Sequence, residues 1–205
     1  MGACAEKGIG LAFCTPRGRF LARVCGEANG NVLLRRVQYR IADEPTACCG
    51  IARTMIFGKL SNSAASIQRT LRDHAPRVQD CGLEKVASDI RGLLPQVLTV
   101  SDPDSLRGLE GTGATAYFGV FDAMLLNRKE DFFFRGRSRR PPLDRVNAML
   151  SFAYSLLAHD CASALESVGL DSYVGFLHRD RPGRQSLALD LMEELRPCMA
   201  DRFVL

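Results

Sequence analysis

The sequence has no apolar run that approaches the roughly 20 residues of a membrane-spanning helix. Its first ten residues, MGACAEKGIG, lack the basic-then-apolar order of a signal peptide. Internal repeats and low-complexity tracts are also absent from the sequence. We therefore expect a cytoplasmic protein.

Motifs typical of cysteine chemistry are absent as well, although the chain has eight cysteines. They include no C-x-x-C pair and no regular spacing. Their positions are Cys4, Cys14, Cys25, Cys48, Cys49, Cys81, Cys161 and Cys198. We expect most of them to be reduced, small core residues rather than ligands of a metal.

Neither sign of charge dominates the composition. The formal net charge is +4 and the pI is near 8.7, which permits nucleic-acid binding without demanding it. With 46% hydrophobic residues, the 205-residue chain can bury a sizeable core. These values fit one globular domain, or one domain with a small appendage.

The first 42 residues have β character. Residues 9–24 read as a hairpin, because two apolar runs flank a Thr15–Gly18 turn that contains proline and glycine. NVLLRRVQYR, residues 31–40, reads as a third extended piece, and the opening residues resemble the tail of a helix that ends at Gly8. An open hairpin cannot bury its own face, so we expect its sheet partners to lie outside this chain or to come from another chain.

From residue 43 onward the pattern is helical. We predict five helices from caps, glycines and prolines. They run from an Asp43 cap to about His74 with a break near Gly58 or at 61–63, from Leu83 to Leu94 before Pro95, from 102–105 to about Leu126, from about Asp144 to Val168 before Gly169, and from Ser186 to about Pro197. We expect residues 171–178, DSYVGFLH, to be extended.

One of these helices is rich in glycine around a single acid. Each glycine costs roughly 0.8 to 1 kcal/mol relative to alanine in a helix interior, so the helix is a poor choice unless something must approach it closely. Glu110 lies in this segment, SLRGLEGTGATAYFGVF. Taken alone, it also fits a surface glutamate on a tightly packed helix.

The last helix carries three acids. At 100° per residue, Asp190, Glu193 and Glu194 share a face. Leu187, Leu191 and Leu195 form an apolar stripe at a spacing of four. Without interleaved lysines these acids repel one another, a cost that a cation would remove. On this helix alone, however, a solvated acidic face is the simpler interpretation.

Basic residues gather around the third histidine and in one loop. His178 precedes Arg179, Arg181 and Arg184, whereas His74 and His159 lie in helical patterns and are expected to be structural. The loop NRKEDFFFRGRSRRPP contains Arg135, Arg137, Arg139 and Arg140, and Arg145 follows it. Arginines at this density are typical of contacts with a nucleic-acid backbone, although a flexible charged loop is an open alternative.

Five segments in order resemble the CRISPR-associated integrase family, the metal-dependent DNA endonuclease known as CRISPR-associated protein one. They are GRFLARV, GNVLLRRVQYR, SLRGLEGTGATAYFGVFD, KEDFFFRGRSRRPPLDRVNAMLSFAYSLLAHDC and YVGFLHRDRPGRQSLALDLMEELRP. They are most similar to the branch that accompanies type I-C systems. The resemblance implies a mainly α fold, in which residues 1–42 are the remnant of an N-terminal β domain. Residues 43–205 would form an α-helical catalytic domain whose C-terminal part is missing.

The resemblance also implies a site. The family binds Mn²⁺ or Mg²⁺ through a glutamate, a histidine and a helix-borne acid, which correspond here to Glu110, His178 and Glu193. Asp190 corresponds to a further acid of the catalytic site. The implied DNA-binding residues are Arg135, Arg137, Arg139, Arg140, Arg179, Arg181 and Arg184. Oxygen ligands with one imidazole suit such an ion and leave positions for water and a phosphate oxygen.

The implied reaction is transesterification, which joins the 3′ end of a captured DNA duplex to a CRISPR array. The implied partners are double-stranded DNA, a second copy of the chain, and a small ferredoxin-like protein, CRISPR-associated protein two. Two alternatives stay open. One is a related integrase of a mobile element, and the other is a non-catalytic fragment that binds DNA or dimerises.

Overall fold

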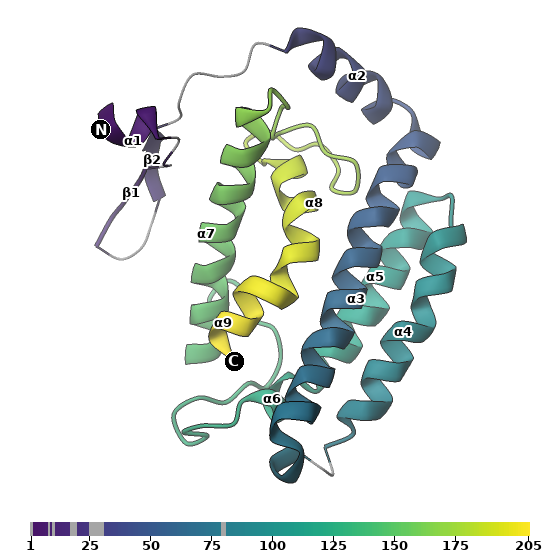
Figure 1. The fold of residues 1–205 in the computed structure, drawn as a ribbon, viewed down its shortest axis with the longest axis vertical. Helices are drawn as coiled ribbons and strands as arrows, with labels where there is room; N and C mark the ends of the chain where they lie inside the picture. Colours follow the sequence, from purple (N-terminus) through teal and green to yellow (C-terminus); the bar gives the residue numbers. More distant parts are fainter. Residues whose placement is uncertain (1, 8, 10, 17–19, 25–30, 79–80) are drawn as a thin grey trace.

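The computed structural model describes residues 2–7, 9, 11–16, 20–24, 31–78 and 81–205 (Figure 1). The fold is mainly α, as predicted, with one two-stranded sheet in the described part. The elements are α1 (Gly2–Glu6), β1 (Leu11–Cys14), β2 (Phe20–Val24), α2 (Val32–Ala42), α3 (Pro45–Val78), α4 (Leu83–Thr99), α5 (Pro103–Gly119), α6 (Phe121–Met124), α7 (Arg145–Ser167), α8 (Ser186–Leu195), the π-helix η1 (Arg196–Asp201) and α9 (Arg202–Val204).

The predicted hairpin is present. β1 and β2 pair antiparallel, with Leu11 opposite Val24 and an irregularity between Phe13 and Cys14. Residues 17 and 18 of the predicted turn and residue 8, the predicted end of the first helix, lie outside the described residues.

The third extended piece was predicted wrongly, because these residues form helix α2. Asn31 caps the helix by accepting a hydrogen bond from the Leu34 backbone N–H at 3.0 Å. Gln38 then anchors the helix to the loop after α7, since its amide donates to the Asp171 and Val174 carbonyls at 2.8 and 2.9 Å. A local cap and a distant polar anchor thus outweigh the β-like pattern.

Helix α3 differs from the prediction at both ends and in the middle. Glu44, not Asp43, caps it, because the Glu44 carboxylate accepts from the Thr46 and Ala47 backbone N–H groups. The helix continues through Gly58 and residues 61–63, and the backbone first departs from helical angles at His74. A Cβ at Gly58 would lie 3.0 Å from Glu194 Cβ, so this glycine permits close packing against α8.

The boundaries of helices α4 to α7 agree in part with those predicted from the sequence. α4 does not stop before Pro95 but continues to Thr99, held by the fully buried Val97. The third predicted helix is divided into α5 and α6. α7 matches its prediction, with Asp144 as its N-cap and Gly169 at φ +90° after it.

Around α8 the predictions hold less well. Residues 171–178 form turns and bends rather than an extended strand. α8 begins at Ser186 as predicted and ends at Leu195, but the chain then continues through Pro197 as the π-helix η1.

Helix α3 lies at the centre of the helical body. It packs against α4, α5 and α8, and α8 packs in turn against α7 (Figure 1). The α3 residues Ile56, Leu60 and Ile67 are almost fully buried in the shared core. A side chain on the middle of α3 can therefore reach both α5 and α8.

The cysteine prediction holds for three residues. Cys48, Cys49 and Cys161 are buried, whereas Cys14, Cys81 and Cys198 are exposed, and Cys4 is intermediate. All seven of these described cysteines are free, and Cys25 lies outside the described residues. No helix in the described part of the chain is long and apolar enough to cross a membrane.

Candidate active site

The three predicted metal ligands line the same pocket, although they come from distant parts of the chain. Glu110 lies on α5, His178 on the loop before α8, and Glu193 on α8. The pocket has a volume of about 390 Å³. Its other lining residues are Asp104, Arg107, Leu177, Arg179 and Arg184.

Asp190 lies behind this pocket and organises the loop that carries His178. Its Oδ2 accepts from the Phe176 and Leu177 backbone N–H groups at 2.6 and 2.9 Å, and its Oδ1 accepts from the His178 N–H at 3.0 Å. The same Oδ1 lies 2.6 Å from His178 Nδ1. This contact favours the tautomer with a proton on Nδ1, which leaves Nε2 free to act as a ligand.

Gly175 allows this loop to lie directly on the start of α8. A Cβ at this position would lie 2.8 Å from Asp190 Oδ2 and 2.9 Å from the backbone carbonyl carbon of Ser186. A side chain here would push the loop away from its carboxylate anchor. The glycine is therefore needed for the close approach that places His178.

A buried lysine joins the two glutamates of the pocket. Lys59, on α3, forms ion pairs with Glu110 and with Glu193, whose Oε2 lies 2.6 Å from Lys59 Nζ. The Lys59 side chain is 9% exposed and that of Glu193 is 5% exposed. Two carboxylates from separate helices are thus arranged around one cationic group.

Glu193 is held as a carboxylate by its surroundings. Burial by itself raises the pKa of Glu193, but the nearby charges of Arg196 and Lys59 outweigh burial, so the pKa lies below its usual value. Arg196 Nη1 lies 2.9 Å from Glu193 Oε1. The acid is therefore ionised at neutral pH although it is almost inaccessible to water.

The solvated acidic face expected for the last helix is wrong. Asp190 is fully buried, Glu193 is 4% exposed, and Glu194 is partly buried against Gly58. The face turns inward because Asp190 and Glu193 meet backbone donors or cations from other elements, which offset the cost of burying them. Most of these partners lie too far away in the sequence for helical periodicity to reveal them, although Arg196 lies only three residues after Glu193.

The donor set fits a divalent ion. Two carboxylates and one imidazole nitrogen are ligands that Mn²⁺ and Mg²⁺ accept. Glu193 Oε2 is buried, and its ion pair with Lys59 lacks hydrogen-bond geometry, so no donor among the described residues satisfies it. As placed, no three acidic, histidine or cysteine side chains of the described chain converge on one point, since the Lys59 ammonium lies between the two glutamates.

A buried polar cluster continues from Glu193 away from the pocket. The Arg196 guanidinium lies 4.8 Å from the centre of the Tyr154 ring, and the Tyr154 hydroxyl donates to Asp201. Burial raises the pKa of Asp201 to about 6. Asp201 and Tyr154 also line a cavity of about 20 Å³ together with Lys59, so this cluster adjoins the pocket through the lysine.

The predicted DNA-binding arginines have different surroundings. Arg135, Arg139 and Arg140 are exposed on the loop before α7. Arg137 instead faces inward, where it donates to Asn147 Oδ1 at 2.8 Å and lies over the Tyr154 ring. Its guanidinium clamps the loop to α7.

Of the three arginines after His178, Arg179 and Arg184 line the pocket and Arg181 does not. Arg179 is exposed and bonds Asp104 at 3.2 Å, while Arg181 is exposed on the following turn. Arg184 is partly buried and donates to the Arg179 carbonyl, which closes the turn. With Arg107, three arginines thus line the pocket together with Glu110, Glu193 and the exposed Asp104.

Sequence reasoning missed Lys59 and Arg107. Lys59 is the one charged residue between Arg53 and Arg69, and an isolated charge in a helix of small and apolar residues is a signal of a buried partner. Arg107 lines the pocket and donates to the Leu177 carbonyl at 3.1 and 3.2 Å, which ties α5 to the His178 loop. It lies one helical turn before Glu110, so the sequence alone indicates that the two side chains share a helix face.

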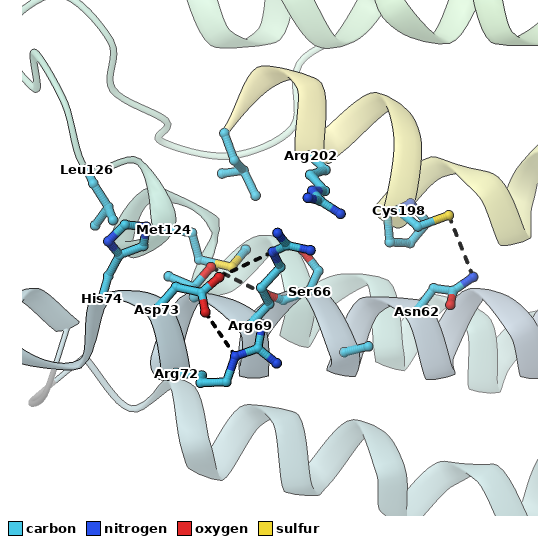
Figure 2. A pocket seen from close by; sticks show the side chains of 14 residues that line it. Asn62, Ser66, Arg69, Arg72, Asp73, His74, Met124, Leu126, Cys198 and Arg202 are labelled. Atoms are coloured by element: carbon cyan, nitrogen blue, oxygen red, sulfur yellow. Dashed lines mark hydrogen bonds and ion pairs between the residues drawn. The ribbon is translucent and has the colours of Figure 1, made fainter.

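A second pocket, of about 380 Å³, shares no lining residue with the first (Figure 2). Figure 2 shows Asp73 between Arg69 and Arg72. The Nε atoms of these arginines lie 3.3 and 2.9 Å from the Asp73 carboxylate oxygens. His74, which was expected to be structural, lines this pocket, while His159 is partly buried on α7. The arginines on the α3 side are thus paired within the protein.

Comparison with known proteins identifies relatives along the whole chain. The chain is 53% identical over 209 residues to a CRISPR-associated endonuclease Cas1 of Rhodospirillum rubrum, covering 100% of this chain and 60% of the relative. Among solved structures, a casposase bound to its integration product superposes with a TM-score of 0.80 at 28% identity, covering 98% of this chain and 54% of that one.

A further solved structure, a partial Cas6-RT-Cas1–Cas2 complex, superposes with a TM-score of 0.73 at 25% identity. It covers 99% of this chain and 59% of that chain. The chain thus spans about 60% of the length of the relatives it matches, and nothing in these matches distinguishes the predicted type I-C branch. The model of the CRISPR associated protein Cas1 family matches residues 1–205, so this chain belongs to the Cas1 family.

Proposed function

We propose that the pocket of Glu110, His178 and Glu193 is the divalent-metal site of a DNA endonuclease and integrase that acts by phosphodiester transesterification. The observation that carries this proposal is that these three side chains, from α5, the His178 loop and α8, line one pocket, which three arginines also line. The names of the relatives, an endonuclease and a casposase with its integration product, support the same chemistry.

Different residues of the pocket would bind the ion, position the imidazole and bind phosphate oxygens. Glu110, Glu193 and the Nε2 of His178 would hold the ion, and Asp190 would fix the imidazole through Nδ1. When bound, Mn²⁺ or Mg²⁺ would polarise the scissile phosphodiester and stabilise charge on the leaving 3′ oxygen. Arg179 and Arg184 lie where they can bind phosphate oxygens beside the pocket.

In the proposed reaction, the oxygen of an attacking 3′-hydroxyl forms a new P–O bond while the bond to the leaving 3′ oxygen breaks. The attacking hydroxyl loses a proton and the leaving oxygen gains one. Attack by water on the same phosphodiester gives nicking instead. One site thus accounts for both endonuclease and integrase chemistry.

Replacement of a ligand tests the proposal. Glu110→Ala should abolish Mn²⁺-dependent nicking and strand transfer on a branched DNA, because a ligand is lost, while the helix content by circular dichroism stays the same. Glu84→Ala, which removes an exposed acid from the first turn of α4, is the matched control and should keep full activity. Undiminished activity in Glu110→Ala would refute the assignment.

A rival is a fragment that binds DNA without turnover. Retardation of a branched DNA in chelator, with no cleavage when Mn²⁺ is added, would favour the fragment. A related integrase of a mobile element is a second rival, which the likeness to the casposase supports. Efficient joining to mobile-element target DNA, with no preference for a CRISPR repeat, would favour that integrase.

We also propose that the protein acts as a homodimer together with a small Cas2-type partner. The likeness to the Cas1–Cas2 complex supports the Cas2-type partner. Mass measurement in solution, with and without the partner, tests it. A mass that stays at one chain under both conditions would contradict the assembly for these 205 residues.

A further inference from the structure

We propose that Lys59 is an internal counter-ion that occupies the space between Glu110 and Glu193 until a divalent ion displaces it. This inference rests on the proposed function, since it concerns the same site. It assigns to α3 a positioning residue that competes with the metal.

Lys59 contacts both glutamates of the proposed metal site. Its ammonium contacts both glutamates that the proposal assigns as ligands, and it is the cation placed between them. An ammonium has three donors and one charge, so it can hold two carboxylates apart at a distance that also suits a small divalent ion. The two cations therefore require the same oxygens.

The ion pair between Lys59 and Glu193 is buried. The Lys59 and Glu193 side chains are 9% and 5% exposed, so the attraction between them is little screened by water. Without any cation, two nearby carboxylates in such a place would repel each other strongly. Lys59 thus keeps the unloaded site folded, and a metal must replace this attraction in order to bind.

A small cavity next to Lys59 provides space for its displaced ammonium. Lys59 also lines the small cavity of about 20 Å³, together with Asp201 and Tyr117. The buried Asp201 carboxylate in this cavity is an acceptor for the displaced ammonium. Rotation about the flexible lysine stem can therefore move the ammonium without unfolding α3.

Metal binding without DNA tests the proposal. Lys59→Met should bind Mn²⁺ about tenfold more tightly than the wild type, since no internal cation must be displaced. Lys85→Met is the matched control, because Lys85 is 80% exposed on α4 and pairs only with Asp89 in the described contacts. Titration of the free Mn²⁺ signal by electron paramagnetic resonance measures both variants, and the control should match the wild type.

The outcomes separate this inference from the proposed function. If the wild type does not bind Mn²⁺, or if binding is unaffected by Glu110→Ala, the metal site itself is wrong. If binding depends on Glu110 but Lys59→Met binds no more tightly than the wild type, the counter-ion role is wrong. In chelator, Lys59→Met should also melt at a lower temperature than wild type, and Mn²⁺ should raise its melting temperature by more.

A wild-type measurement covers the case in which Lys59→Met does not fold. In a crystal of the wild type grown with Mn²⁺, the Lys59 ammonium should have left at least one of the two glutamates. An ion bound by Glu110 and Glu193 while Lys59 still contacts both would overturn the proposal.

Discussion

His178 depends on Asp190 for the orientation of its ring. A histidine on a loop samples several rotamers, but the short contact between Nδ1 and Asp190 Oδ1 selects one of them. The same carboxylate holds the backbone of residues 176–178 through three N–H groups. The position of one side chain in the pocket therefore rests on a second that does not line it.

Asp190→Asn should weaken Mn²⁺ binding by about 10- to 100-fold, because an amide holds the imidazole less well than a carboxylate. It should also lower the free energy of unfolding by about 1–3 kcal/mol, because the amide NH₂ would face backbone donors. Mn²⁺ titration and urea unfolding measure the two effects. Asp180→Asn, on the exposed loop, is the control, and equal effects in both variants would contradict this role for Asp190.

Asp201 should make stability depend on pH. Burial raises its pKa in the folded chain from 3.8 to about 6, so the folded state binds the proton more tightly than the unfolded state. The groups that face it are Tyr154 on α7, Tyr117 on α5, Arg196 on η1 and Lys59 on α3. Its favourable contribution is complete below pH 4 and is lost as pH rises through about 6.

Replacement of Asp201 should remove this dependence. Relative to Asp201→Asn, the wild type should lose up to about 3 kcal/mol of unfolding free energy between pH 4 and pH 7. Urea unfolding of both proteins at several pH values measures the difference. A difference that stays constant with pH would mean that Asp201 titrates at its ordinary value in the folded chain.

At the scale of elements, the loop that carries His178 packs directly against the start of α8, and Gly175 permits this contact. Gly175→Ala should lower the free energy of unfolding by about 1–3 kcal/mol, since its Cβ would overlap with Asp190 and with the Ser186 backbone. Gly92→Ala, on α4, is the control, because a Cβ there meets no described atom within 4 Å. It should instead stabilise the helix by about 0.5–1 kcal/mol. Similar effects of the two changes would contradict the packing argument.

The helices could be predicted where local signals act alone. Asp102, Asp144 and Gly169 mark the boundaries of α5 and α7 as expected, because caps and left-handed glycines depend on neighbouring residues. Helix α2 could not be predicted, because its anchor, Gln38, binds a loop about 133 residues away. Likewise Pro95 does not end α4, since packing on α3 outweighs one missing hydrogen bond.

Only the resemblance to a known family predicted from the sequence that these residues form one site. Local patterns pointed to Glu110, His178 and Glu193 as separate features, and no periodicity relates residues 68 positions apart. Lys59 was missed because its partners lie on two other helices. Tertiary packing, which places α3 between α5 and α8, is what brings these charges together.

At the scale of the molecule, exposed arginines should control how salt affects DNA binding. Arg140→Ala should reduce the slope of log K against log salt concentration by about 1, if its side chain neutralises one phosphate. Arg137→Ala should leave that slope unchanged and lower stability, because Arg137 is bonded to Asn147. Gel retardation over a range of salt concentrations and urea unfolding test the pair, and the reverse pattern would contradict the assignment.

The central place of α3 has a consequence for the order of events during synthesis. Lys59 leaves the ribosome early, whereas Glu193 emerges more than 130 residues later, and both belong to one cluster of charges. A nascent polypeptide therefore lacks one of the two carboxylate partners of Lys59 until nearly all of this segment has been translated. Any chemistry proposed for the assembled pocket must wait for that moment, so an incomplete chain should lack it.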